Sequence, residues 1–446
     1  MLIMEKFLRF GRRQLHTIIS REIIKPSSPT PSHLHTYHLS PLDLHAPHSY
    51  VPLILFYPNN KGNRSLTANE KAQELKKSLS QTLTRYYPFA GRINSPYNID
   101  CNDEGVVFVE AENDSPLEKF QNMSEEDHTI NQLFADGMVW EDQDCSHRTG
   151  LMGVQLNRFA CGGIGLAVSI SHRVGDGCTI GSYMTHWASV ARYGSTHHKE
   201  VLPLNPRFIQ SPPAITSLPL KSSDSNDQAS CADYVTRKFV FPNNKLNELK
   251  NKVEVNNPTR VEILCSLIYK TAVEAAGSGK PGSFKPSFLV IPVDVRKNFN
   301  PKLPETTVGN FISLMLVTTR QESEISLSKV VSEIKKEKME LNRVQSMQQA
   351  VENVESFMSR LGDEDLENVA KRSIWCSSLC GFPYNKVDFG WGKATGATVI
   401  LGSSNRTGFM LMDTPDGSGI QARVVLGKEN MEMFENDKEL LSFCQI

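Results

Sequence analysis

A histidine and an aspartate four residues apart are the side chains of this sequence best placed to do chemistry. His172 comes directly after the apolar run 164–171, and Asp176 lies between Gly175 and Gly177. An imidazole has an unperturbed pKa close to neutrality, so it suits a general base that removes one proton. The two glycines favour a tight turn over a helix interior. We therefore predict that His172 sits at the end of a buried strand, with Asp176 curled back into the protein as a structural brace.

Two short patterns about half a chain apart indicate a family. The first is H-x-x-x-D-G, which starts at His172, and the second is D-F-G-W-G at residues 388–392. Together, in this order, they resemble the two signatures of the plant BAHD acyltransferases, which use acyl-CoA as donor. The block at 87–92 resembles a further family motif, Y-P-x-A-G-R. The likeness spans nearly the whole chain from Ile23, and is greatest to the vinorine synthase, deacetylvindoline and salutaridinol acetyltransferase group.

The resemblance implies a fold and the place of the site within it. Strands and helices alternate in both halves of the chain, which fits two α/β lobes. The family likeness implies lobes similar to chloramphenicol acetyltransferase, with mixed β-sheets, flanking helices and a tunnel along their interface. His172 would lie in mid-tunnel, reached by acyl-CoA from one end and by the acceptor from the other. The resemblance also implies that Asp176 points away from the tunnel and pairs with Arg296.

Further candidate site residues lie in the second half of the chain. Asp388 is a second-rank catalytic candidate, and the resemblance implies that its loop shapes the CoA side. The other residues of that loop are Phe389, Gly390, Trp391 and Gly392. Ser377 is a candidate hydrogen-bond donor to the oxyanion of a tetrahedral intermediate or a contact to the acyl group. Leu379 and Gly381 stand where relatives usually carry Trp and Arg, so a non-catalytic metabolite-binding paralogue or acyltransferase partner is the alternative interpretation.

Composition excludes several classes of protein. The formal net charge of −1 argues against a nucleic-acid-binding protein, which usually carries a basic excess. Nine cysteines without a C-x-x-C pair fit free thiols in a reducing compartment, and no metal site is expected. The longest apolar runs are too short to span a bilayer. A serine hydrolase would need a G-x-S-x-G elbow, which the sequence lacks.

Changes in composition along the chain predict its domains. We expect an N-terminal extension at 1–21, an N-terminal lobe at 22–202, a Pro-rich and then polar linker at 203–233, and a C-terminal lobe at 234–446. Within the last of these, Thr259 and Glu262 have the spacing of a capping box before a helix. We expect a cytoplasmic protein. The Arg-rich, acid-poor extension leaves an organelle transit peptide as the alternative.

These observations predict an O-acyltransferase that acts as a monomer. It would move an acyl group, most simply acetyl from acetyl-CoA, to a hydroxyl of a plant alkaloid or terpenoid. A thioester is already activated, so a base that takes the hydroxyl proton and returns it to the CoA thiolate is sufficient. No covalent acyl-enzyme and no bound cofactor are required beyond the acyl-CoA co-substrate.

Overall fold

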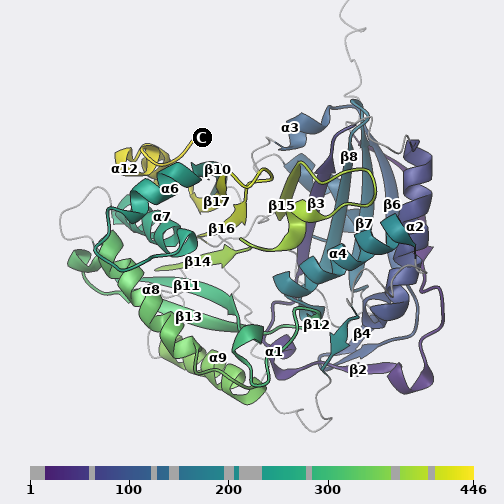
Figure 1. Cartoon of the computed structure of the whole chain (residues 1–446), viewed down its shortest axis with the longest axis horizontal. Helices are drawn as coiled ribbons and strands as arrows, with labels where there is room; N and C mark the ends of the chain where they lie inside the picture. Colours follow the sequence, from purple (N-terminus) through teal and green to yellow (C-terminus); the bar gives the residue numbers. More distant parts are fainter. Residues whose placement is uncertain are drawn as a thin grey trace, which may run out of the picture.

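The protein consists of two lobes, each built around a six-stranded sheet (Figure 1). The structure is a computed structural model that describes residues 16–59, 66–121, 128–139, 150–194, 205–209, 234–277, 284–362, 372–399 and 407–445. Most of the predicted linker and the first fifteen residues of the predicted extension lie outside the described residues.

The sheet of the first lobe has the strand order β1-β6-β7-β8-β3-β15. Its strands are antiparallel apart from the parallel pair β6 and β7. Its bounds are β1 His16–Ile24, β3 Tyr50–Tyr57, β6 Val106–Asn113, β7 Met152–Phe159, β8 Ile164–Ser171 and β15 Gly396–Val399. Every residue of β3 and β8 is buried, as expected for central strands covered on both faces.

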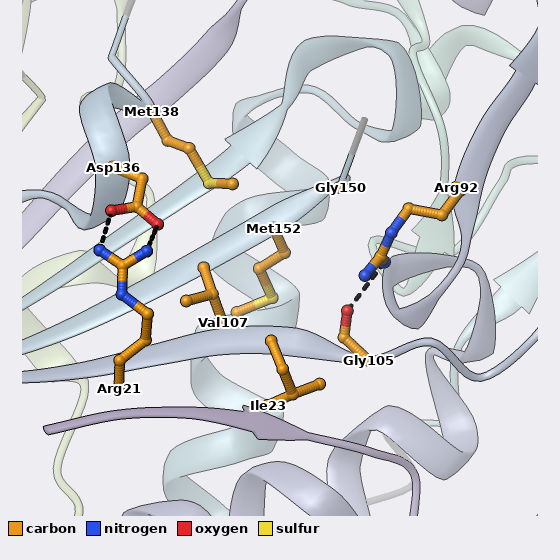
Figure 2. Close-up of a pocket in the computed structure, with 9 residues that line it drawn as sticks. All are labelled: Arg21, Ile23, Arg92, Gly105, Val107, Asp136, Met138, Gly150 and Met152. Carbon is orange, nitrogen blue, oxygen red and sulfur yellow. Dashed lines mark hydrogen bonds and ion pairs between the residues drawn. The ribbon is translucent and has the colours of Figure 1, made fainter. Parts of the chain in front are cut away.

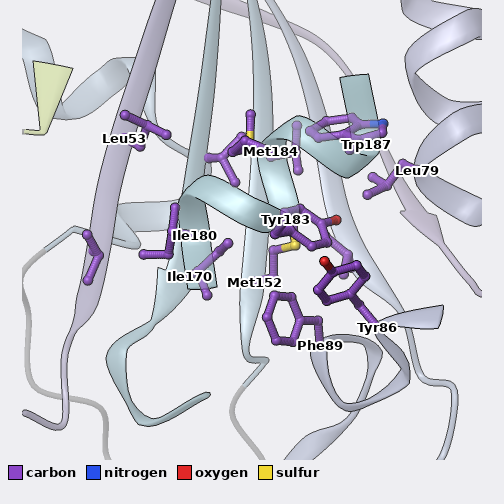
Figure 3. Packing of buried hydrophobic residues seen from close by; sticks show 14 of the residues in the cluster. Leu53, Leu79, Tyr86, Phe89, Met152, Ile170, Ile180, Tyr183, Met184 and Trp187 are labelled. Carbon is purple, nitrogen blue, oxygen red and sulfur yellow. The ribbon is translucent and has the colours of Figure 1, made fainter. Parts of the chain in front are cut away.

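Two helices, α2 (Ala68–Arg85) and α4 (Gly177–Tyr193), cover one face of this sheet. Figure 3 shows the packing of α4 against the strands through Ile180, Tyr183, Met184 and Trp187. The Trp187 indole also donates a hydrogen bond to Ser78 Oγ of α2, 3.0 Å away. Because α4 starts just after His172, this packing fixes the position of the histidine loop relative to the sheet.

The sheet of the second lobe has the order β10-β17-β16-β14-β11-β13. Its strands are β10 Tyr234–Pro242, β11 Ser287–Asp294, β13 Ile312–Thr319, β14 Ser373–Ser378, β16 Gly408–Asp413 and β17 Gly419–Gly427. Its helices are α6 Asn243–Lys250, α7 Arg260–Gly277, α8 Leu327–Leu341, α9 Met347–Gly362, α11 Lys428–Glu435 and α12 Lys438–Leu441. The predicted capping box before α7 is confirmed, since Thr259 and Glu262 exchange side-chain to backbone hydrogen bonds.

Smaller elements complete the first lobe and the contact between the lobes. A three-stranded sheet contains β2 Thr36–His38, β5 Asn98–Asp100 and β4 Arg92–Ser95. The strands β9 Arg207–Phe208 and β12 Thr307–Val308 pair in parallel. The short helices are α1 Pro41–Leu44 and α3 Leu117–Gln121. The helix α1 packs against both the histidine loop of its own lobe and α9 of the other lobe.

The pairings of two strands differ from the predicted division into consecutive domains. β1 starts at His16 and pairs with β6, so residues 16–21 belong to the first lobe and not to an extension. β15 comes from the C-terminal part of the chain, yet it pairs antiparallel with β3 of the first lobe. The chain therefore crosses between the lobes more than once, which a division into consecutive segments does not capture.

Candidate active site

His172 lies where the two lobes meet. It follows the last residue of β8 and opens a single 3₁₀ turn, His172–Val174. Its backbone N–H donates to the Ser49 carbonyl just before β3, at 2.8 Å. Its ring contacts Asn310, a residue of the second lobe between β12 and β13. The strand end, the neighbouring strand and the opposite lobe thus all hold the position of this one residue.

The hydrogen bonds of Asn310 determine which imidazole nitrogen carries the proton. Asn310 Nδ2 donates to Asp43 Oδ1 at 2.9 Å and to the His172 carbonyl at 2.7 Å. Both partners accept at this amide, so its nitrogen must face them and its Oδ1 must face the imidazole. Oδ1 can only accept, and His172 Nδ1 lies 3.1 Å from it. The neutral ring is therefore protonated on Nδ1, which leaves the lone pair of Nε2 available for a proton.

The surroundings of His172 favour its neutral form. Burial lowers the pKa of the ring below its ordinary value, although a hydrogen bond to the residue's own backbone, the charge of Asp176, the bond to Asn310 and the charge of Asp43 act in the opposite direction. A neutral imidazole is the form that accepts a proton, so a lowered pKa favours the form that a general base would need at neutral pH.

Asp176 and Arg296 form a buried ion pair across the lobe interface. Arg296 donates to both oxygens of Asp176, at 2.7 and 3.0 Å, and the two side chains are 1% (Asp176) and 0% (Arg296) exposed. Asp176 also caps α4 by accepting the Thr179 N–H at 2.9 Å, and accepts the Phe311 N–H at 3.0 Å. Burial alone would raise the pKa of Asp176, but the Arg296 guanidinium and these N–H groups hold it below its ordinary value.

Arg296 also donates to the loop that carries Asn310. Its N–H groups reach the carbonyl oxygens of Thr307 and Gly309 at 2.9 to 3.2 Å, and further hydrogen bonds of 3.1 Å go to Asp294 Oδ1 and Thr179 Oγ1. Arg296 therefore ties the Asn310 loop, the start of α4 and Asp176 into one unit. Both oxygens of the Asp176 carboxylate accept hydrogen bonds within this unit, which fits the structural role predicted for it.

The two glycines around Asp176 are closely packed. A Cβ atom at Gly175 would lie 2.4 Å from Thr179 Cγ2, and one at Gly177 would lie 2.9 Å from Leu379 Cδ2. The Gly177 carbonyl also accepts a 2.7 Å hydrogen bond from the Tyr384 hydroxyl. The segment that follows β14 therefore lies directly against the first turn of α4.

Ser377 is close to this contact in sequence and faces the first lobe. Its register partner on β16 is Met410, which packs within the core of the first lobe, and neighbouring residues in register share a face of the sheet. Two residues later, Leu379 touches α4. Gly381 has a φ of +86°, a conformation that an arginine would adopt only with strain. Its N–H donates to Asp413 at 2.6 Å. The role of Ser377 at the oxyanion stays a prediction.

The D-F-G-W-G loop is packed at the opposite end of α4 from His172. Asp388 Oδ1 accepts the N–H groups of Gly390 and Gly392 at 2.8 and 3.0 Å, and Oδ2 pairs with Arg192 at 2.9 Å. Phe389 is fully buried against Trp187 of α4. Because α4 has 17 residues, about 25 Å of helix separates this loop from the histidine loop. Asp388 shapes its own loop from there, and its place as a second-rank catalytic candidate stays a prediction.

A cavity of about 300 Å³ lies elsewhere on the first lobe (Figure 2). It is bordered by the ion pair of Arg21 with Asp136 and by Arg92, which donates to the Gly105 carbonyl. None of the predicted site residues lines it. Within the described part of the chain, no group of three or more His, Cys, Asp or Glu is arranged to hold a metal, and no helix is long and apolar enough to cross a membrane.

Comparison with known proteins decides the family. The model of the Transferase family matches residues 16–441. Akuammiline synthase 1 of Alstonia scholaris is 36% identical over 96% of this chain and 97% of its own length. The chain belongs to the BAHD family of acyl-CoA-dependent acyltransferases.

Two further relatives bear on fold and chemistry. The crystal structure of vinorine synthase superposes with a TM-score of 0.81 at 27% identity, covering 96% of this chain and 98% of that one. This match confirms the predicted α/β fold of two acetyltransferase-like lobes. An epi-neemfruitin B 7-O-acetyltransferase of Melia azedarach is 33% identical, covering 96% of this chain and 98% of its own. The tunnel itself stays a prediction.

The site also contains residues that sequence reasoning missed. Asn310 and Asp43 are 138 and 129 positions from His172, and no local pattern links either of them to it. The signal for Asp43 was the segment 40–43, where Ser40 and Asp43 form a capping box for α1. Nothing in that local pattern indicates that the same carboxylate also holds an amide of the other lobe.

Proposed function

We propose that this BAHD transferase moves an acetyl group from acetyl-CoA to a hydroxyl group of a plant alkaloid or terpenoid. The observation that carries the proposal is the fixed tautomer of His172, whose Nε2 lone pair is free to act as a base. The family supplies the acyl-CoA donor. Relatives named for an alkaloid product and for limonoid acetylation support the acceptor class and the acyl group.

The proposed reaction needs one proton to move twice. His172 Nε2 removes the proton of the acceptor hydroxyl as its oxygen attacks the thioester carbonyl. The tetrahedral intermediate then collapses to the ester, and the proton passes from Nε2 to the departing CoA sulfur. General-base assistance of this type typically contributes about 10²- to 10⁴-fold in rate. Holding both substrates at one site adds the advantage of proximity. No acyl-enzyme forms.

We further propose a cytoplasmic monomer. Both lobes that meet at His172 come from a single chain, so one copy supplies every described site residue. The seven cysteines among the described residues are free thiols, which fits a reducing compartment.

The test is a substrate panel with two donors. Purified protein would be incubated with acetyl-CoA or malonyl-CoA and a panel of alkaloid and triterpenoid alcohols, while free CoA thiol and ester mass are followed. We expect alcohol-dependent thiol release that is fastest with acetyl-CoA, and an unchanged intact mass of the enzyme with donor alone. A folded protein that binds these alcohols but releases no thiol with either donor would establish the alternative, a non-catalytic binding paralogue.

A further inference from the structure

Asp43 is a buried carboxylate whose hydrogen bonds come from neutral groups. The residue is 1% exposed. Its Oδ2 accepts the Ser40 N–H at 2.9 Å, and its Oδ1 accepts the N–H and the side-chain amide of Asn310 at 2.7 and 2.9 Å. Asp176, by contrast, has the Arg296 guanidinium beside it. Burying a carboxylate is costly, and hydrogen bonds from neutral donors offset that cost only in part.

The amide of Asn310 links this carboxylate to the imidazole. Its Nδ2 faces Asp43 and its Oδ1 faces His172 Nδ1, so the two contacts lie at opposite ends of one planar group. An amide that turned over would place its oxygen against a carboxylate oxygen and its NH₂ against Nδ1. The charge of Asp43 makes that arrangement unfavourable.

We propose that Asp43 is a positioning residue for His172, acting through Asn310. Its carboxylate holds the amide in the orientation that keeps a proton on Nδ1. Its charge stabilises the imidazolium that exists between abstraction of the acceptor proton by Nε2 and its return to sulfur. The proton on Nδ1 stays there throughout. This inference rests on the proposed function, in which His172 is the base.

The charges around the pair agree with this arrangement. Asp43 raises the pKa of His172 against the larger effect of burial, which lowers it. The other described charged group that acts on the ring is Asp176, and Arg296 pairs with it. On the side of Asp43 lies Tyr37, whose pKa is raised by burial and then by the Asp43 charge. Burial also raises the pKa of Asp43 itself.

The first experiment compares Asp43→Asn with Ser40→Ala. Asp43→Asn removes the charge and keeps the shape. Loss of an outer carboxylate that orients a metal-bound histidine typically costs about 10- to 100-fold in activity, and we expect a fall of similar size in kcat here, with little change in KM. The acidic limb of the kcat/KM profile should move to lower pH, because the pKa of His172 falls. Ser40→Ala removes the other half of the α1 capping box. We expect Ser40→Ala to lower the melting temperature and to leave kcat and the pH profile unchanged.

The second experiment measures the protonation of the His172 ring directly. The ¹⁵N spectrum of histidine-labelled protein, with His172 assigned from the His172→Gln variant, reports which ring nitrogen is protonated. We expect protonation on Nδ1 in the wild type and a mixture of tautomers in Asp43→Asn and in Asn310→Ala. The double variant Asp43→Asn with Asn310→Ala should be no slower than Asn310→Ala, because both changes remove the same orienting contact to His172.

The outcomes separate the two proposals. An unchanged tautomer and pH profile in Asp43→Asn, with only a lower melting temperature, would show that Asp43 merely caps α1. If Asp43→Asn does not fold, Asn310→Ala decides the same question, since it leaves Asp43 bonded to two backbone N–H groups. A wild-type protein that turns over no alcohol would refute the proposed function, while the ring spectrum would still decide whether Asp43 sets the tautomer.

Discussion

The two signature aspartates lie at opposite ends of α4, and their surroundings differ. At the first end, Asp176 and Arg296 are 1% and 0% exposed and join the two lobes. At the far end, Asp388 and Arg192 are 18% and 44% exposed, and the carboxylate mainly caps its own loop. Both aspartates bind backbone N–H groups and an arginine. The first end also carries His172 in the turn directly before the helix, so a shared pattern of contacts does not imply a shared role.

The comparison predicts that chemistry is confined to the His172 end. His172→Gln removes the base without removing a structural charge, so turnover should fall by about 10²- to 10⁴-fold while the protein stays folded. Initial rates of CoA release and the melting temperature would be measured side by side. His38→Gln is the matched control, because that ring bonds Asn98 in the small sheet of the first lobe. Equal losses in both variants would contradict a specific role for His172.

At the same end, removing Asp176 should destabilise the protein. Asp176→Ala removes the buried carboxylate that accepts two hydrogen bonds from Arg296, and leaves the partly exposed Asp294, at 3.1 Å, as its other carboxylate. Breaking a buried ion pair by removing one partner typically costs about 3–5 kcal/mol. We expect a low soluble yield and a much lower melting temperature, with activity lost because the fold is lost. A well-folded Asp176→Ala protein whose turnover alone is abolished would instead make Asp176 part of the chemistry.

The pKa of Asp176 gives this prediction a pH dependence. Its folded-state pKa lies below the ordinary value of 3.8, so its ion pair stabilises the protein above that pH. The stabilisation is lost as the pH falls through the lower, folded-state pKa. The gap in melting temperature between the wild type and Asp176→Asn should therefore be widest near neutrality and shrink once the pH drops below 3.8. A gap that grows on acidification would show that the sign of the shift is wrong.

The sequence predicted what depends on neighbouring residues. The strand, turn and helix around His172 follow from the apolar run and the glycines, and the capping box before α7 follows from Thr259 and Glu262. Arg296 was named through the family likeness, not from its own surroundings. The contacts of Asn310 and Asp43 were missed because they join segments more than a hundred residues apart. The pairing of β15 with β3 was missed for the same reason, since the sequence of a four-residue strand does not indicate which strand it pairs with.

At the other end of α4, removing Asp388 should have a moderate effect. Asp388→Ala leaves the Gly390 and Gly392 N–H groups without their acceptor, and Asp388 is still 18% exposed. Each lost hydrogen bond of this kind is worth about 0.5–1.5 kcal/mol. We expect a fall in melting temperature smaller than that of Asp176→Ala, and a rise in KM for acetyl-CoA larger than any fall in kcat. A collapse of kcat with an unchanged KM would support a catalytic role for Asp388.

The smallest effect is expected from Arg192→Ala, which removes the arginine and keeps the loop. Its side chain is 44% exposed and meets Asp388 at 2.9 Å. Partly exposed ion pairs of this kind contribute about 0–1 kcal/mol, because water solvates both charges and side-chain entropy opposes the contact. The two backbone hydrogen bonds of Asp388 remain, so the loop should keep its shape and KM for acetyl-CoA should barely change. Arg296→Ala is the matched variant, and it should destabilise the protein far more. If the two arginine variants had similar melting temperatures, the difference in burial would not explain why the two ends of α4 have different roles.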